Sequence, residues 1–355
     1  MLPVSIITGF LGSGKTTLLN HLLRQPSFEN SLVIVNEFGE IGIDHLLVSA
    51  PAENTRLLSN GCLCCEIRGE LFETLTEVVR SRGVGDTPSF DRILIETTGL
   101  ADPVPILRTI VTDNDLRQFL RLDKVISVVD AVHALTQLVG YDEARKQIAV
   151  ADVLLLSKAD LVDPRARGEV INAMKAINAG AELAVVNCGE IDPEKLFRKS
   201  PFDSHDLGRW ITDENHAHSH HTAGIGTISL AYDGPISESG LATWLSMITA
   251  FKGSQLLRVK GIVNVRGNPY AVHVVQTVVH PPVPLGAWPT PDARTRIVLI
   301  GRNLEEATLE RSFQAFTLAE SLSDTFEIDP VIYARFREAA EQMVSRSVIK
   351  DRLLI

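Results

Sequence analysis

Short apolar runs separated by longer mixed segments form the main pattern of roughly the first 200 residues. Each run is mostly aliphatic and rich in β-branched residues, as in strands that a parallel sheet buries on both faces. The runs are "VSIIT" (4–8), "LVIVN" (32–36), "RILIE" (92–96), "KVISVVD" (124–130), "DVLLLS" (152–157) and "LAVVN" (183–187). Helical patterns lie between them, at 15–25, 68–82 and 165–178. This alternation predicts an α/β fold, a doubly wound, mostly parallel sheet, over residues 1–212.

The pattern changes at "DENHAHSHHTAG" (213–224), which is polar, lacks an apolar period and ends in Gly. We interpret 213–223 as a linker. Beyond it, 224–316 predicts a smaller α+β domain on an antiparallel sheet, and 317–355 predicts a helical tail. The expected strands are 225–232, 256–265, 271–280 and 294–301, with helices at 237–251 and 304–316.

Length and charge limit the classes of protein that fit. The 355 residues exceed what one compact core usually holds, so two domains are expected. Acidic residues outnumber basic ones 44 to 34, which argues against nucleic acid as a partner. The apolar start, 4–8, has no basic region before it, and no run of about 18 apolar residues follows. We therefore expect no signal peptide, no membrane partner and a cytoplasmic protein, with a homo-oligomer left open.

The segment "GFLGSGKT" matches G-x-x-x-x-G-K-[ST] at every fixed position. Its glycines let the backbone N–H groups surround phosphates, Lys15 reaches the β and γ phosphates, and the Thr16 hydroxyl binds Mg²⁺. The positive end of the following helix faces the same anion. Because a strand precedes the motif and a helix follows it, we expect a nucleoside triphosphate site. Its candidate residues are Gly9, Gly12, Ser13, Gly14, Lys15, Thr16 and Thr17.

A second phosphate-sensing element is predicted in "RILIETTG" (92–99), where a strand ends in an acidic residue. Ligands bind at this end of parallel strands. Glu96 is longer than the Asp that many P-loop proteins carry, so we expect it to hold Mg²⁺ through a water. The Gly99 N–H is expected to sense the γ phosphate. Together Lys15, Thr16 and Glu96 are the candidate catalytic residues.

Selection of the base is predicted from "SKAD" (157–160), again at the end of a strand. Many GTPases carry [NT]-K-x-D there, and the Asp accepts two hydrogen bonds that guanine donates and adenine does not. Lys158 and Asp160 match, whereas Ser157 departs from the pattern but can still tie loops together. The motif favours GTP over ATP. The next strand leads into "VVNCGE" (185–190), which could close over the base with Cys188 as an ordinary small residue.

Three of the four cysteines lie together in "NGCLCC" (60–65), just before the helix expected near Ile67. Cys62, Cys64 and Cys65 cannot easily bridge one another, so the spacing favours a reducing compartment. Thiols in this spacing supply soft ligands for Zn²⁺ or a similar ion. We expect two thiolates in the metal shell, completed by a donor such as Glu37 or Glu40 of "VNEFGEIGID" (35–44). Buried small hydrophobes and a redox role are the alternatives.

The linker adds a short histidine run, "HAHSHH". Such a tract is a loose metal collector, or else a solvated segment without a role. The candidate accessory ligands are His216, His218, His220 and His221.

Five motifs occur in one order: "GFLGSGKTT", "NEFGEIGID", "NGCLCC", "ETTGLADP" and "VVDAVHA". Together they resemble the CobW-type P-loop GTPases, a group that includes metal chaperones for zinc and cobalt proteins. The resemblance covers most of the chain, since "LLRVKGIVNV" and "RTRIVLIGRNL" are similar to the family's C-terminal domain. It implies a GTPase that binds a metal at the C-x-C-C motif and hands it to a client apoprotein. It also implies phosphate contacts from Gly12 to Thr17.

The resulting hypothesis is a GTP-binding and GTP-hydrolysing metallochaperone, with Zn²⁺ favoured and Co²⁺ left open. Segments 36–44 and 60–66 lie in one connection between phosphate-contacting strands, so order imposed by the γ phosphate would reach the thiols. No arginine finger or water-positioning Gln is evident, and slow unassisted turnover of about 10⁻⁴ to 10⁻³ per second is expected. The alternatives are a small-molecule kinase or ligase with structural cysteines, and a non-catalytic zinc store.

Overall fold

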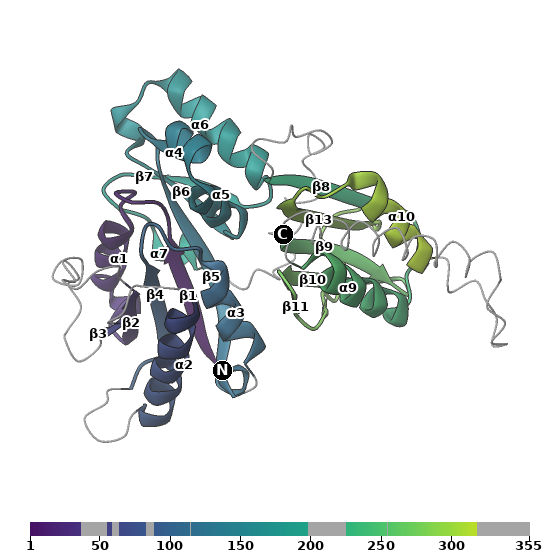
Figure 1. Ribbon diagram of the computed structural model, residues 1–355, viewed down its shortest axis with the longest axis horizontal. Helices are drawn as coiled ribbons and strands as arrows, with labels where there is room; N and C mark the ends of the chain where they lie inside the picture. Colours follow the sequence, from purple (N-terminus) through teal and green to yellow (C-terminus); the bar gives the residue numbers. More distant parts are fainter. Residues whose placement is uncertain are drawn as a thin grey trace, which may run out of the picture. The chain divides into compact units, whose positions relative to one another are not determined.

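A computed structural model describes residues 1–36, 55–58, 64–82, 89–113, 115–197, 225–253 and 255–317. The chain forms two compact units, Met1–Pro201 and Phe202–Ile355 (Figure 1). The predicted linker, 213–223, and the predicted tail beyond Thr317 lie outside the described residues. Within the described ranges, every helix is too short or too polar to cross a bilayer.

The first unit is built on a seven-stranded sheet in the order β3-β2-β4-β1-β5-β6-β7. All neighbouring strands run parallel, which confirms the predicted doubly wound α/β fold. The strands are β1 (Leu2–Thr8), β2 (Ser31–Asn36), β3 (Thr55–Leu58), β4 (Arg92–Thr97), β5 (Leu120–Asp130), β6 (Val153–Ser157) and β7 (Glu182–Val186). Six of them cover the six apolar runs, except that β6 omits the first residue of its run and β7 omits the last. The residues of β1, β2, β4, β5 and β6 are mostly buried, as expected for strands that are apolar on both faces, whereas Val185 of β7 is exposed.

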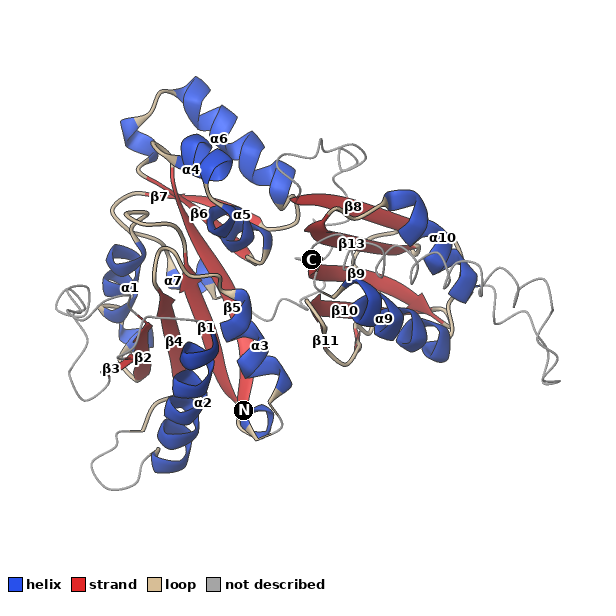
Figure 2. Ribbon diagram, in the orientation of Figure 1, coloured by secondary structure: helices blue, strands red, loops and turns tan. Residues whose placement is uncertain are grey.

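Helices cover the sheet. Leu18, Leu19 and Leu22 of α1 pack on Val33 and Leu155 of the strands, forming the core of one face. Figure 2 shows α2 and α3 in front of the sheet. The helices are α1 (Lys15–Leu23), α2 (Cys64–Ser81), α3 (Val104–Thr112), α4 (Ala134–Gly140), α5 (Asp142–Ala149), α6 (Pro164–Ile177) and α7 (Pro193–Leu196), with 3₁₀ turns η1 (Pro26–Phe28), η4 (Leu116–Gln118) and η5 (Ala159–Leu161).

The second unit is the predicted smaller α+β domain. Its sheet has the order β11-β10-β9-β13-β8, with β12 paired to β10, and the pairs are antiparallel. Trp244 and Phe313 meet edge to face at 4.8 Å and join the two helices in one core with the sheet. The elements are β8 (Ile225–Tyr232), α9 (Glu238–Lys252), β9 (Leu256–Val265), β10 (Asn268–Val275), β11 (Val278–Val279), β12 (Val283–Pro284), β13 (Thr295–Arg302) and α10 (Glu306–Thr317).

Three expectations about the elements were wrong in detail. The single strand expected over 271–280 is a hairpin, because the chain reverses at Gln276, whose φ is 50°, and Val279 pairs back with Val274. The helix expected to begin near Ile67 begins at Cys64. The edge strand β3, only four residues long, was not predicted.

Candidate nucleotide site

The phosphate-loop segment leaves the carboxyl end of β1 and enters α1. Gly12 and Gly14 have φ values of 71° and 98°, and the Ser13 N–H donates to Phe10 O at 3.1 Å, which closes the turn. Gly14 begins α1 without a side-chain cap. The first N–H groups of a helix have no partner inside the helix, so an uncapped start of this kind is suited to an anion.

Lys15 is the cation of this loop. It is buried, and its Nζ lies 3.3 Å from Phe10 O, which is long for a hydrogen bond from an ammonium group. Ser13 is also fully buried, and its hydroxyl has no hydrogen-bond partner among the described residues. The loop therefore combines a buried cation and an orphaned hydroxyl with a helix start. This donor set fits the phosphates of a nucleotide.

The structure brings Thr16 and Glu96 together although 80 residues separate them in sequence. Thr16 Oγ1 donates to Glu96 Oε1 at 2.7 Å, and Glu96 is 3% exposed. Because the Thr16 hydroxyl donates this hydrogen bond, the lone pairs on its oxygen remain available to a cation. A hydroxyl oxygen beside a buried carboxylate is oxygen chemistry that fits Mg²⁺.

The turn after β4 lies directly against the phosphate loop. A Cβ on Gly99 would meet Leu11 N at 2.6 Å, so only glycine permits this approach. Gln147 of α5 is buried and donates to Gly99 O at 3.1 Å and Ala101 O at 3.0 Å. Sequence reasoning missed Gln147, because a single polar residue in a short amphipathic helix gives no signal of its role.

The base-recognition segment is tied to the phosphate loop by two side chains. Ser157 Oγ lies 2.7 Å from Ser13 O, to which it donates, and 3.2 Å from Val129 O. Lys158 has a left-handed backbone, with φ of 55°, and its Nζ donates to Gly12 O at 2.8 Å. Asp160 follows in η5 and is exposed. The departure at Ser157 therefore keeps a hydroxyl link between this segment and the phosphate loop.

Sequence reasoning also missed Asp130, the last residue of β5. Its Oδ2 accepts from Lys158 Nζ at 2.7 Å and lies 3.1 Å from His133 Nδ1. Burial alone would raise the pKa of the Asp130 carboxyl, but the hydrogen bonds from Lys158 and His133 and from the Val132 N–H lower it below its ordinary value. The signal was present in "VVDAVHA", where an acid ends a buried strand.

The loop after β7 lies beside the start of α1. Gly189 has a φ of 77°, and a Cβ there would come within 2.9 Å of Leu18 N and of Thr17 C. The preceding Cys188 is exposed. Four loops, which follow β1, β4, β6 and β7, thus converge on one edge of the sheet, together with the end of β5.

Comparison with known proteins bears directly on this edge. A family model for the CobW/HypB/UreG nucleotide-binding domain matches residues 3–185, and one for the cobalamin synthesis protein cobW C-terminal domain matches 225–317. This chain belongs to the CobW family.

Curated relatives agree with this membership. The zinc chaperone YjiA of Escherichia coli is 34% identical over 268 residues, 76% of this chain and 83% of that protein. The zinc chaperone CobW of Pseudomonas aeruginosa is 32% identical over 355 residues, 87% and 89% of the two chains. A crystal structure of Zn(II)-bound YjiA GTPase from E. coli matches with a TM-score of 0.62 at 27% identity, covering 89% of this chain and 98% of that one.

The predicted metal residues of this CobW-family chain fall mostly outside the described residues. These are Cys62, Glu37, Glu40, His216, His218, His220 and His221. Cys64 and Cys65 form the start of α2. Within the described ranges, no group of three or more His, Cys, Asp or Glu residues is placed to hold a metal.

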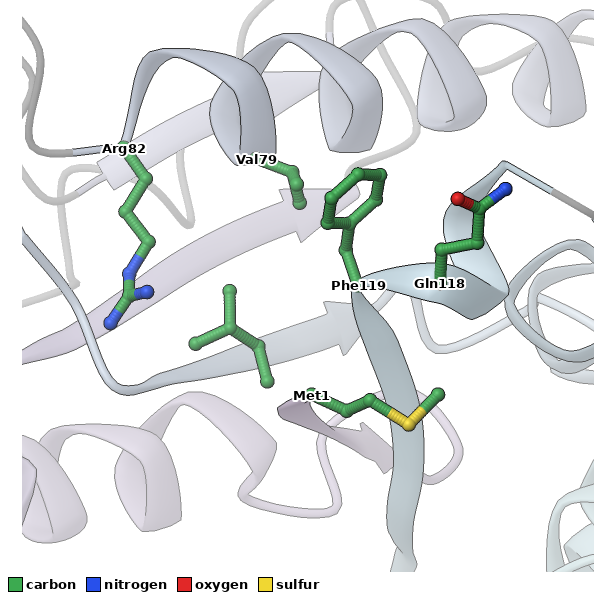
Figure 3. A pocket seen from close by; sticks show the side chains of 6 residues that line it. Met1, Val79, Arg82, Gln118 and Phe119 are labelled. Carbon is green, nitrogen blue, oxygen red and sulfur yellow. The ribbon is translucent and has the colours of Figure 1, made fainter.

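A separate hollow of about 380 Å³ lies at the amino end of the same sheet (Figure 3). Met1 and Phe119 lie beside it, and Arg82 donates from Nε to Phe90 O at 2.6 Å on its rim. The amino end is opposite the edge at which the phosphate loop lies. This hollow is therefore distinct from the nucleotide site of the CobW-family domain.

Proposed function

We propose that this protein is a GTP-hydrolysing zinc metallochaperone that binds Zn²⁺ through Cys62, Cys64 and Cys65 and delivers it to a client apoprotein. Its GTPase class follows from the family, whose relatives include a YjiA GTPase and zinc-regulated GTPases. The cytoplasm is the proposed location, because a reducing compartment keeps such thiols free.

The proposed nucleotide binding takes place at the carboxyl ends of the parallel strands described above. Lys15 and the first N–H groups of α1 bind the β and γ phosphates, and Lys158 with Asp160 recognises guanine. Thr16 and Glu96 would hold Mg²⁺, which neutralises charge on the phosphate oxygens when bound. Gly99 places its backbone against the phosphate loop, where its N–H is proposed to sense the γ phosphate.

The metal-binding part of the proposal is supported by the pairing of β4 with β2 and of β2 with β3. Thr97, next to Glu96, pairs with Asn36 of β2, and Asn36 pairs with Leu58 of β3. Adjacent strands are about 4.8 Å apart, so Leu58 lies roughly 10 Å from Thr97. The chain leaves β2 toward segment 36–44, and it leaves β3 toward segment 60–66, which contains the three clustered cysteines. The segment after β2 therefore begins one strand away from the end of β4, and the segment after β3 begins two strands away.

The start of α2 suits the proposed metal site. Cys64 and Cys65 occupy its first turn, where the helix N-terminus favours negative charge. Thiols bind Zn²⁺ as thiolates, so this position favours the metal-binding form. Glu40 or Glu37 would complete the shell, with His216, His218, His220 and His221 as accessory ligands.

The coupling follows from this placement. If the γ phosphate orders the segment after β2, the same order changes the donors available to Zn²⁺. Thermodynamic reciprocity then requires Zn²⁺ to change nucleotide affinity by the same factor. Hydrolysis removes the γ phosphate and loosens the metal beside its client.

The test is an anaerobic Zn²⁺ titration against a chromophoric chelator. It is run without nucleotide, with GDP·Mg²⁺ and with a non-hydrolysable GTP·Mg²⁺ analogue. We expect Zn²⁺ affinity to differ about tenfold between nucleotide states, a coupling of about 1.4 kcal/mol. Cys64→Ser should abolish the difference.

Cys188→Ser is the matched control, because Cys188 is the one cysteine outside the motif. It should retain the nucleotide dependence of the wild type. Equal Zn²⁺ affinity in all three states, or normal binding by Cys64→Ser, would overturn the proposed cycle.

A further inference from the structure

Asp130 is a buried acid at the base-recognition end of the site. It is 1% exposed, and both of its carboxylate oxygens are engaged. Oδ2 accepts from Lys158 Nζ and faces His133 Nδ1, while Oδ1 accepts from the Val132 N–H at 2.8 Å. A buried carboxylate is costly unless it is paired and hydrogen-bonded, so these contacts define where it can lie.

The contact with Lys158 fixes an unfavourable backbone. Lys158 has a φ of 55°, a left-handed conformation that side-chain-bearing residues rarely adopt. Such a conformation persists only when the surroundings hold it. Its ammonium group is held from two sides, by the Asp130 carboxylate at 2.7 Å and by Gly12 O at 2.8 Å.

The backbone continues directly into the predicted base contact. Leu161 N donates to Lys158 O at 3.1 Å, closing the 3₁₀ turn that contains Asp160. The position of the Lys158 side chain and the position of Asp160 are thus properties of one short turn. A change at Asp130 reaches Asp160 through that turn.

We propose that Asp130 is a positioning residue for guanine recognition, which it serves by holding Lys158 over the phosphate loop and so setting the turn that presents Asp160. The proposal rests on the GTPase function proposed above. His133 contacts the same carboxylate oxygen as Lys158, and the Val132 N–H donates to the other oxygen. The lowered pKa of Asp130 agrees with this role, because the ionised carboxylate is the form that pairs with the Lys158 ammonium group.

A purely structural role would act differently. If Asp130 only capped the turn after β5 through the Val132 N–H, its loss would lower stability and weaken every nucleotide alike. If Asp130 positions Asp160, its loss should weaken binding most for a nucleotide whose base donates hydrogen bonds to Asp160. Inosine diphosphate lacks the 2-amino group that Asp160 is proposed to accept from, so the preference for GDP over inosine diphosphate reports that contact.

The experiment measures GDP, inosine diphosphate and ADP affinities by equilibrium competition with a fluorescent GDP analogue, using the full chain. Asp130→Asn should weaken GDP binding about tenfold, the usual scale for a hydrogen bond to a charged group. It should change inosine diphosphate binding less, so the preference for GDP shrinks. Asp152→Asn is the matched control. Asp152 is a buried acid at the amino end of β6, which accepts from the Val125 N–H at 2.9 Å.

A double-mutant cycle with Lys158→Met completes the test. Because Asp130 acts through Lys158, the two losses of GDP preference should be non-additive. Asp130→Ser, whose hydroxyl can still accept the Val132 N–H, replaces Asp130→Asn if the latter does not fold. An unchanged GDP preference in a folded variant, or additive effects, would overturn the positioning role. A wild type that binds GDP, inosine diphosphate and ADP equally would instead overturn the proposed guanine nucleotide function.

Discussion

The predicted phosphate side and the predicted base side of the nucleotide site each contribute a lysine, and the two lysines contact different groups. Lys15 Nζ lies 3.3 Å from a neutral carbonyl, that of Phe10. Lys158 Nζ lies 2.7 Å from the Asp130 carboxylate and 2.8 Å from Gly12 O. The first distance is long and the second pair is short and charge-assisted.

The difference separates two uses of the same side chain. A neutral carbonyl attracts an ammonium group less than a carboxylate does, so the contact between Lys15 and Phe10 O opposes phosphate binding less than an ion pair would. A lysine that is expected to pack its alkyl stem on a base can form an ion pair between its ammonium group and a protein carboxylate. We therefore expect phosphate oxygens to replace Phe10 O at Lys15, whereas Lys158 is expected to keep its pairing with Asp130.

The largest test of this comparison is Lys15→Ala. It should lower the rate of GTP hydrolysis about hundredfold or more, because one electrostatic donor to the reacting group is lost. Phosphate release measures the rate, and Lys175→Ala on the exposed face of α6 is the control. A pure zinc store would keep its metal function in Lys15→Ala. Hydrolysis at the wild-type rate would show that the phosphate side does not depend on this cation.

The next test concerns the cation site on the phosphate side. Glu96→Gln keeps the shape of the side chain and removes its charge. The Mg²⁺ concentration for half-maximal hydrolysis should rise about tenfold, as is typical when an outer ligand is lost. A Mg²⁺ titration of activity measures this, with the exposed Glu169→Gln as control. No change in Mg²⁺ dependence would remove Glu96 from the site.

On the base side, Ser157→Ala removes the donor to Ser13 O and Val129 O. Leaving buried carbonyls with fewer donors should cost about 1 kcal/mol of the free energy of unfolding. Thermal unfolding measures it. Ser127→Ala is a close control, because the Ser127 hydroxyl is buried and has no hydrogen-bond partner among the described residues. Equal loss of stability in Ser157→Ala and Ser127→Ala would show that the hydrogen bonds of Ser157 do not stabilise the base side.

Lowering the pH should weaken the base side less than the substitutions above weaken the site. The pKa of Asp130 is lower in the folded state than its ordinary value, so the ionised carboxylate stabilises the fold. This stabilisation is present above about pH 4, the ordinary pKa of Asp. It is lost as the pH falls through the lower pKa of the folded state. The stability difference between wild type and Asp130→Ser should be constant from pH 7 to 5. It should shrink as the pH falls below about 4, because protonation of Asp130 removes its pairing with Lys158. A difference that grows in acid would contradict the pairing with Lys158 and His133.

Much of the fold followed from local pattern, because a buried parallel strand must be apolar on both faces. The six runs, from 4–8 to 183–187, could be recognised for that reason. β3 could not, since "TRLL" is short and only half apolar. The hairpin at Gln276 was missed because its turn carries Gln and Thr instead of Gly or Asn, so an apolar run continued across it.

The candidate nucleotide site also has one part that the sequence predicted and one part that it did not. The phosphate loop is one contiguous motif, and its turn is set by neighbours in sequence. Asp130 and Gln147 act on partners 28 and 48 residues away, Lys158 and Gly99. Contacts of that kind depend on which strand ends become neighbours in the sheet. The local pattern marks Asp130 as an acid at the end of a buried strand, but it does not reveal the partner of either residue.

The lengths of the strands in the first domain have a consequence for its behaviour at high concentration. The interior strand β5 has eleven residues, whereas the edge strands β3 and β7 have four and five. Exposed strand edges are templates on which other chains can pair and aggregate. Because both edges of this sheet are short, they give neighbouring molecules little backbone to extend, which opposes edge-to-edge aggregation of this domain.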